Sequence, residues 1–135
     1  MTRLKQLIPT APRGDCMRTV FACLLDKQHP NEVPNFMRKG AKCFEMYIKK
    51  FLEENNLVWV EVPFAHLGEC LFVPLGYCGV TGKSPRGRYN HIIVGEIVRC
   101  ENTLQINYVH DPSPLHDGVF FESDPLWIGF LTRKL

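Results

Sequence analysis

The stretch HIIVGEIVRCENTLQINYVHD, residues 91–111, decides the fold that this chain can adopt. Its first half is apolar and rich in β-branched residues, which predicts a long strand. Glu101-Asn102-Thr103 predicts a turn, and Leu104–Val109 predicts a strand that pairs back on the first. A hairpin brings its two outer ends together. We therefore expect His91 and Asp111, which flank the hairpin, to lie at the same end of a sheet.

The residues before this hairpin carry a helical pattern. From Cys16 onward, apolar side chains recur at i, i+3, i+4, i+7 and i+8, which predicts a helix that starts at Cys16. Asp15 is expected to be its N-cap, and the helix should end before His29-Pro30 because the residue before a proline avoids the α region. A second helix is predicted over residues 40–54, with one apolar stripe and one charged face.

Strand patterns dominate after residue 56. The predicted strands are Leu57–Val62, Leu71–Val73, Tyr77–Thr81, His91–Arg99, Leu104–Val109 and Leu126–Thr132. Helices that come first and strands that follow predict an α+β fold, with N-terminal helices packed on a mostly antiparallel sheet. The length of 135 residues predicts one domain that spans residues 1–135.

Composition and charge exclude several classes of protein. The hydrophobic share of 45% and the charged share of 22% are those of a globular protein. A net charge of +2 is too small to indicate nucleic-acid binding. No apolar run reaches the roughly 20 residues of a membrane span, and no signal peptide is recognisable. We expect a soluble, cytoplasmic protein, in which the basic group Lys83, Arg86 and Arg88 forms a solvated loop face.

The six cysteines are expected to stay reduced in such a compartment. None of them forms a CxxC pair, so the sequence predicts neither a zinc ribbon nor a redox motif, and no cofactor. Cys23, Cys43 and Cys100 lie among apolar residues and are interpreted as small core side chains. Cys16 differs because it follows Gly14-Asp15 in a polar setting.

Three residues in this arrangement point to nucleophilic catalysis. A thiol in the first turn of a helix lies in the positive field of the helix N-terminus, which favours the reactive thiolate. His91, at the start of a strand, is the candidate general base. Asp111 is the candidate acceptor that orients the imidazole. The pattern alone does not show that Cys16 and His91 are neighbours.

Two alternatives use other residues of the same region. His110 could replace His91 as the base, although adjacent residues of a strand point to opposite faces. His110, His116 and Asp117 could instead bind a metal ion, although their spacing is not a strong ligand pattern.

Several segments give the chain a resemblance to a known family. They are Gly14-Asp15-Cys16-Met17-Arg18-Thr19, Glu32-Val33-Pro34-Asn35-Phe36, Gly82-Lys83-Ser84-Pro85-Arg86-Gly87, His91-Ile92-Ile93-Val94-Gly95 and Val109-His110-Asp111-Pro112-Ser113-Pro114. With these segments the chain resembles the papain-like cysteine peptidase superfamily. It is most similar to the compact C39-like peptidases that cleave bacteriocin leaders, and to small uncharacterised proteins of phages and bacteria.

The resemblance implies a nucleophile helix packed on a sheet that carries the histidine and the aspartate. It also implies a glutamine upstream of the cysteine that helps to form the oxyanion hole, which here would be Gln6 together with the backbone N–H of Cys16. The expected activity is that of a cysteine peptidase or amidase acting on a peptide, isopeptide or amide, through a thioester on Cys16.

A binding module is the rival hypothesis. The same fold could act without catalysis, for example as a phage-encoded inhibitor of a host protein. Small size and the aromatic residues Phe36, Tyr89 and Trp127 motivate this alternative, although a core role is the simpler expectation for Trp127.

Overall fold

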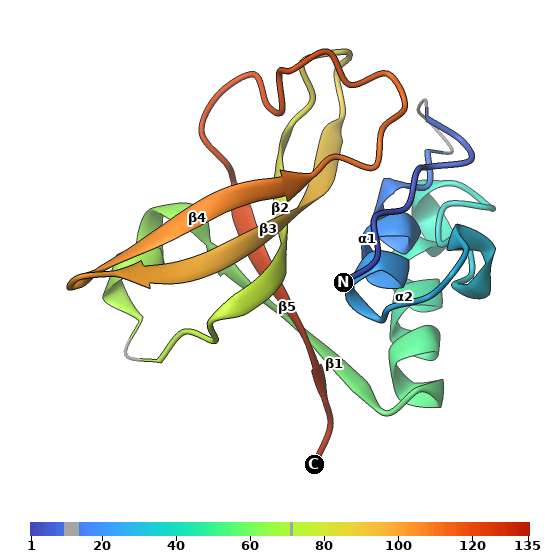
Figure 1. The fold of residues 1–135 in the computed structure, drawn as a ribbon. Coiled ribbons are helices and arrows are strands. Elements are labelled where there is room, and N and C mark those ends of the chain that lie inside the picture. Colours follow the sequence, from blue (N-terminus) through green and yellow to red (C-terminus); the bar gives the residue numbers. More distant parts are fainter. Residues whose placement is uncertain (10–13, 71) are drawn as a thin grey trace.

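Helices and a five-stranded sheet make up the structure, a computed structural model that describes residues 1–9, 14–70 and 72–135. The elements are α1 (Cys16–Leu24), η1 (Pro30–Glu32), α2 (Ala41–Glu54), β1 (Leu57–Pro63), η2 (Phe64–Glu69), β2 (Gly76–Lys83), β3 (Asn90–Cys100), β4 (Thr103–His110) and β5 (Trp127–Arg133). Both α-helices precede the strands and lie on one side of the sheet (Figure 1). The prediction of an α+β fold with N-terminal helices on an antiparallel sheet is confirmed.

The sheet has the strand order β1-β5-β2-β3-β4, and all neighbouring strands are antiparallel. The β3–β4 hairpin is paired from Cys100 and Thr103 at its turn to Val94 and His110 at its other end. A register shift between Val94 and Gly95 marks a bulge, which bends a strand locally. The predicted hairpin is confirmed, and its polar flanking residues lie at the end away from the turn.

Helix α1 packs directly on β3. Val20 and Cys23 of the helix meet Ile92 and Val94 of the strand in a fully buried cluster. A second cluster, which includes Phe21, Phe36, Phe51 and Leu57, fills the space between the two helices and β1. Burying one such side chain contributes roughly 1.5–3 kcal/mol. This packing fixes where the N-terminus of α1 lies relative to β3.

A third cluster covers the sheet on its far side from α1. It contains Cys78, Val80, Ile93, Ile97 and Ile128, with Leu67 of η2 against them. Alternating residues of β3 thus serve opposite faces, as the twofold period of a strand requires.

Two local predictions were wrong. Residues 72 and 73 form no strand, and the segment before them is the 3₁₀-helix η2; Leu71 lies outside the described residues. Helix α1 ends at Leu24, before His29-Pro30 as predicted, and Asp26 just after it adopts a left-handed φ of 56°. Cys100 is exposed beside the hairpin turn and is not a core residue.

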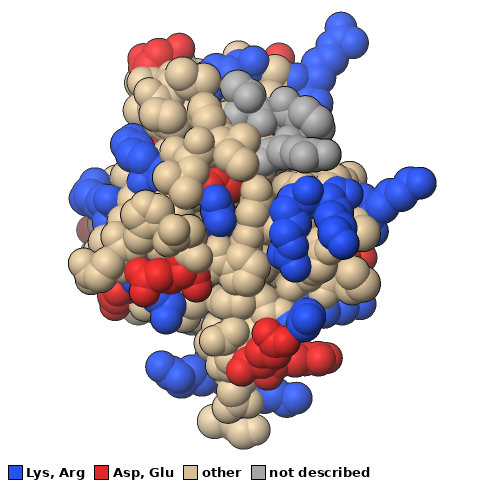
Figure 2. All heavy atoms as spheres, turned by 90° about the vertical axis from the view of Figure 1, so that its right-hand side faces the viewer, with Lys and Arg blue, Asp and Glu red and all other residues tan. Residues whose placement is uncertain are grey.

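The surface carries a mixture of charges. On the side that bears the helices, cationic and anionic side chains are interspersed (Figure 2). In the described ranges, no helix is long and apolar enough to cross a membrane.

Candidate active site

Cys16 is the first residue of α1 and lines a cleft of about 260 Å³. The cleft also exposes Gln6, Gly14 and His91. Its apolar wall comes from four side chains, Met17, Met37, Phe44 and Ile92. The structure therefore brings the predicted nucleophile and the predicted base to one opening, although 75 positions separate them in the sequence (91 − 16).

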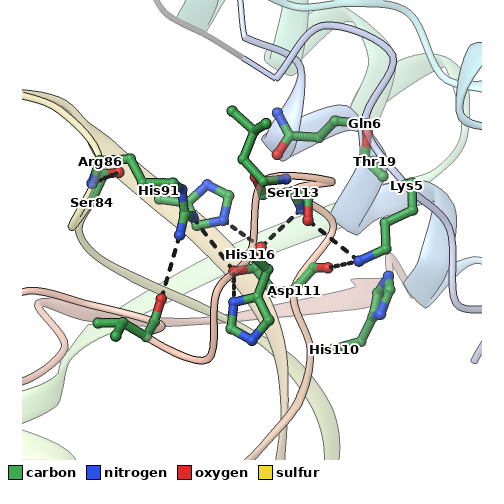
Figure 3. Close-up of polar contacts among 12 residues, drawn as sticks. Lys5, Gln6, Thr19, Ser84, Arg86, His91, His110, Asp111, Ser113 and His116 are labelled. Atoms are coloured by element: carbon green, nitrogen blue, oxygen red, sulfur yellow. Dashed lines mark hydrogen bonds and ion pairs between the residues drawn. The ribbon is translucent and has the colours of Figure 1, made fainter.

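His91 lies between Cys16 and Asp111. Its Nε2–H donates to Oδ1 of Asp111 over 2.7 Å, and both side chains are almost fully buried (Figure 3). Cys16 also acts on the imidazole, because its side chain and charge raise the pKa of His91. Since Nε2 is engaged with Asp111, Nδ1 is the ring nitrogen left to interact with the thiol. His91 is thus coupled to both residues.

The electrostatics of this pair favour two charged partners. Burial lowers the pKa of His91, but the hydrogen bonds and charges of Asp111 and Cys16 outweigh burial and raise that pKa to about 9. Burial raises the pKa of Asp111, but the His91 contact, the Ser113 N–H and the Arg86 charge together hold it below its ordinary value. At neutral pH, His91 is therefore an imidazolium on an ionised carboxylate.

Asp111 has polar neighbours on both oxygens. Oδ1 accepts from His91 and from the backbone N–H of Ser113 at 2.9 Å. Oδ2 lies 3.5 Å from Nη2 of Arg86 and 2.9 Å from Nδ1 of His116. Figure 3 shows Asp111 at the centre of these contacts. The predicted solvated role of Arg86 was wrong, because its side chain is mostly buried against this carboxylate.

Asp15 has a different role from the predicted one. It occupies the N-cap position of α1, but its side chain makes no capping hydrogen bond. Its carboxylate accepts from the backbone N–H groups of Leu7 and Ile8, at 3.2 and 2.9 Å, and pairs with Nε of Arg18 at 2.9 Å. Asp15 thus ties the N-terminal segment to the helix that carries Cys16.

Gln6 belongs to the segment that Asp15 holds. Its backbone N–H donates to the Pro112 carbonyl, and its Nε2 donates to the Ile8 carbonyl at 3.1 Å. Its Oε1 is buried and has no hydrogen-bond partner among the described residues. One N–H of the side-chain amide is left over, because an NH₂ group has two hydrogens. Gln6 is therefore placed at the cleft with one donor to spare.

The other histidines of the region lie elsewhere. His110 directs Nε2 to the Leu4 carbonyl, and burial together with Lys5 and Arg3 lowers its pKa. This contact is with the backbone of the N-terminal segment and leaves His91 as the histidine on Cys16. In the described parts of the chain, no group of three His, Cys, Asp or Glu residues is arranged to hold a metal ion, and His110, His116 and Asp117 form no such group.

The contacts of Arg86 and His116 were missed from the sequence. A weak signal was available, since both residues lie in loops rich in glycine, proline and serine that flank the ends of β3 and β4. Such loops hold functional side chains more often than strand interiors do.

No family model matches the chain, and neither a curated protein nor a solved structure shows significant similarity to it. What the fold and the site define is therefore limited to an α+β protein in which a cysteine and a histidine line one cleft and the histidine is hydrogen-bonded to a buried aspartate.

Proposed function

We propose that the chain is a cysteine hydrolase of the papain-like type, with Cys16 as nucleophile, His91 as acid and base, and Asp111 as the group that orients His91. One observation carries the proposal: a buried imidazole that is hydrogen-bonded to Asp111 at 2.7 Å lines the same cleft as Cys16, the first residue of α1. A nucleophile on a base, with the base held by a third group, is the arrangement of covalent acyl-transfer catalysis.

The reaction begins with the proton already on His91. The sulfur of Cys16 attacks the carbonyl carbon of an amide, and the resulting oxyanion is stabilised by the backbone N–H of Cys16 and the spare N–H of Gln6. The C–N bond then breaks as His91 gives its proton to the leaving amine. Neutral His91 next takes a proton from water, and the hydroxide attacks the thioester. The acid leaves, and Cys16 and His91 return to their starting state.

The substrates we propose are peptide, isopeptide or other amide bonds, with an apolar group near the scissile carbonyl. In support of the apolar group, Met17, Met37 and Phe44 give adaptable apolar surface to the cleft that Cys16 lines. Carbonyl chemistry of this kind uses no bound metal or organic cofactor, because the nucleophile, the base and the oxyanion donors are all protein groups.

Thiol reactivity tests the proposal. Wild-type protein is titrated with iodoacetamide between about pH 5 and 8, and the modified cysteines are located by mass spectrometry. We expect Cys16 to react first at the acidic end of this range, since the imidazolium of His91 stabilises its thiolate. His91→Ala should remove this preference. Equal and slow modification of Cys16 and the exposed Cys100 in both proteins would contradict the proposal.

Partner binding without catalysis is the second candidate function. Phe36, one of the aromatic residues that suggested it, is buried in the core, but Phe72 is 93% exposed and the nearby segment of the sequence also exposes Leu75 and Tyr77. Exposed apolar groups that are close together are typical of protein contacts. A protein that shows no selective reaction at Cys16, and loses a partner on Phe72→Ser, would favour this function.

A further inference from the structure

We propose that Arg86 and His116 are positioning residues that hold the second oxygen of Asp111, so that its first oxygen stays on His91. This inference rests on the proposed function, because it assigns the supports of the orienting carboxylate. Neither residue touches the substrate cleft, so they would act through Asp111.

The two oxygens of Asp111 have different surroundings. Oδ1 has two well-formed hydrogen bonds, from His91 and from the Ser113 N–H. Oδ2 is buried and accepts no hydrogen bond from the described residues, yet Arg86 and His116 both lie within ion-pair distance of it. A buried carboxylate oxygen without a cation nearby would be costly. Arg86 and His116 are therefore the two groups that face the second oxygen of Asp111 at this depth.

Arg86 reaches Asp111 from the loop between β2 and β3. Its other contacts are with the loop that follows β4: Nη1 donates to the Val119 carbonyl at 3.4 Å and lies 4.0 Å from Asp117. At its own end, the Arg86 N–H donates to Oγ of Ser84 at 3.1 Å. The guanidinium thus joins the two loops on either side of Asp111, as expected of a group with several fixed donors.

His116 reaches the same oxygen from the other loop. Its Nδ1 is 2.9 Å from Oδ2 but does not point at it well enough for a hydrogen bond, and it has no other partner among the described residues. Its ring packs against Phe120, with the centroids 4.6 Å apart. Phe120 in turn contacts Tyr108 of β4. This aromatic support keeps the imidazole beside the carboxylate.

These contacts fix the orientation of the Asp111 carboxylate. With Oδ2 faced by groups on two loops, the carboxylate cannot rotate away from His91 without losing its contacts with both Arg86 and His116. Orientation of the imidazole by a carboxylate matters in triads because it sets which ring nitrogen carries the proton. Removing either side chain should therefore loosen the Asp111–His91 contact and make Asp111 easier to protonate.

The test is a nuclear magnetic resonance titration of the Asp111 carboxyl carbon from about pH 7 down to 2, which needs no substrate. We expect Arg86→Gln and His116→Leu each to raise the acid midpoint of Asp111 by about one pH unit. Arg86→Lys keeps a positive charge, and His116→Asn keeps a nitrogen donor at the position of Nδ1, so both should restore most of the shift. Arg88→Gln and His66→Leu are matched controls in exposed positions and should leave the midpoint unchanged.

The outcomes separate this inference from the proposed function. If Asp111 has the wild-type acid midpoint in folded Arg86→Gln, Arg86 does not position Asp111 and the inference is overturned for Arg86. The same result in folded His116→Leu would overturn the inference for His116. Because the two residues lie in different loops, one remains testable if the other variant does not fold. The acid midpoint is independent of Cys16 reactivity, so failure of the labelling experiment would leave this result standing.

Discussion

Two cysteines stand in the first turn of a helix, and only one of them is a candidate nucleophile. Cys16 begins α1 and Cys43 is the third residue of α2, and both are partly exposed. The helix N-terminus therefore offers both thiols a positive field. Cys16 also faces a buried histidine on an ionised carboxylate, whereas Cys43 does not line that cleft. A helix start therefore gives a thiol a positive field, but the thiol becomes a candidate nucleophile only where the neighbouring sheet places a histidine beside it.

The largest expected effect comes from removing the sulfur of Cys16. Cys16→Ala should reduce hydrolysis of an activated acyl ester by roughly 10³- to 10⁶-fold, because no other group would form the acyl intermediate. Cys43→Ala is the matched control and should keep the wild-type rate. Equal loss in the two variants would mean that the ester reacts by another route.

The next effect concerns the carboxylate. Asp111→Asn should lower turnover by about 10⁴-fold with little change in KM, since an amide no longer fixes the protonation of the imidazole. Circular dichroism of the variant checks that the fold is kept. A variant with wild-type turnover would remove Asp111 from the mechanism.

The sequence anticipated one part of this site better than the other. The hairpin of residues 91–111 could be predicted because strand periodicity and a turn are local signals, and pairing then places His91 and Asp111 at one end. The approach of Cys16 to His91 depends on how α1 packs on β3, through contacts such as Val20 with Ile92. Periodicity identifies the faces of these elements but not their mutual orientation.

The roles of short polar side chains could not be predicted for a related reason. Asp15 stands where an N-cap is expected, yet its carboxylate is used by Leu7, Ile8 and Arg18. Arg86 stands in a loop with the composition of a solvated turn, yet the fold brings a buried carboxylate against it. The Asp15 partners are near in sequence but do not belong to the capping pattern, and the Arg86 partner comes from the loop after β4, so neither contact follows from local spacing.

A smaller effect sharpens the comparison at the helix start. Asp15→Ala should lower the free energy of unfolding by roughly 3–5 kcal/mol, because it leaves the Arg18 guanidinium buried without its partner. Denaturant unfolding measures the loss. Glu54→Ala, which breaks the exposed pair with Lys50, is the control and should change stability by less than about 1 kcal/mol. Similar losses of unfolding free energy in the two variants would show that the pair of Asp15 and Arg18 does not stabilise the start of α1.

The pH dependence of stability gives the smallest effect. The raised pKa of His91 makes its contribution complete below its ordinary value of 6.5, and this contribution is lost as the pH rises through about 9. The lowered pKa of Asp111 makes its contribution complete above its ordinary value of 3.8, and lost as the pH falls below it. The difference in unfolding free energy between wild type and Asp111→Asn should therefore be largest between these two ordinary values. A difference that is constant across the whole range would argue against a charged pair.

The most direct test of the account is the titration of the His91 ring followed by nitrogen nuclear magnetic resonance in wild type and in Cys16→Ser. If His91 contacts both Asp111 and the sulfur, the wild-type ring stays doubly protonated until the pH approaches about 9, and the midpoint falls in Cys16→Ser. A wild-type midpoint near the ordinary value of 6.5, unmoved by the loss of the sulfur, would contradict the central claim that these three side chains act as one unit.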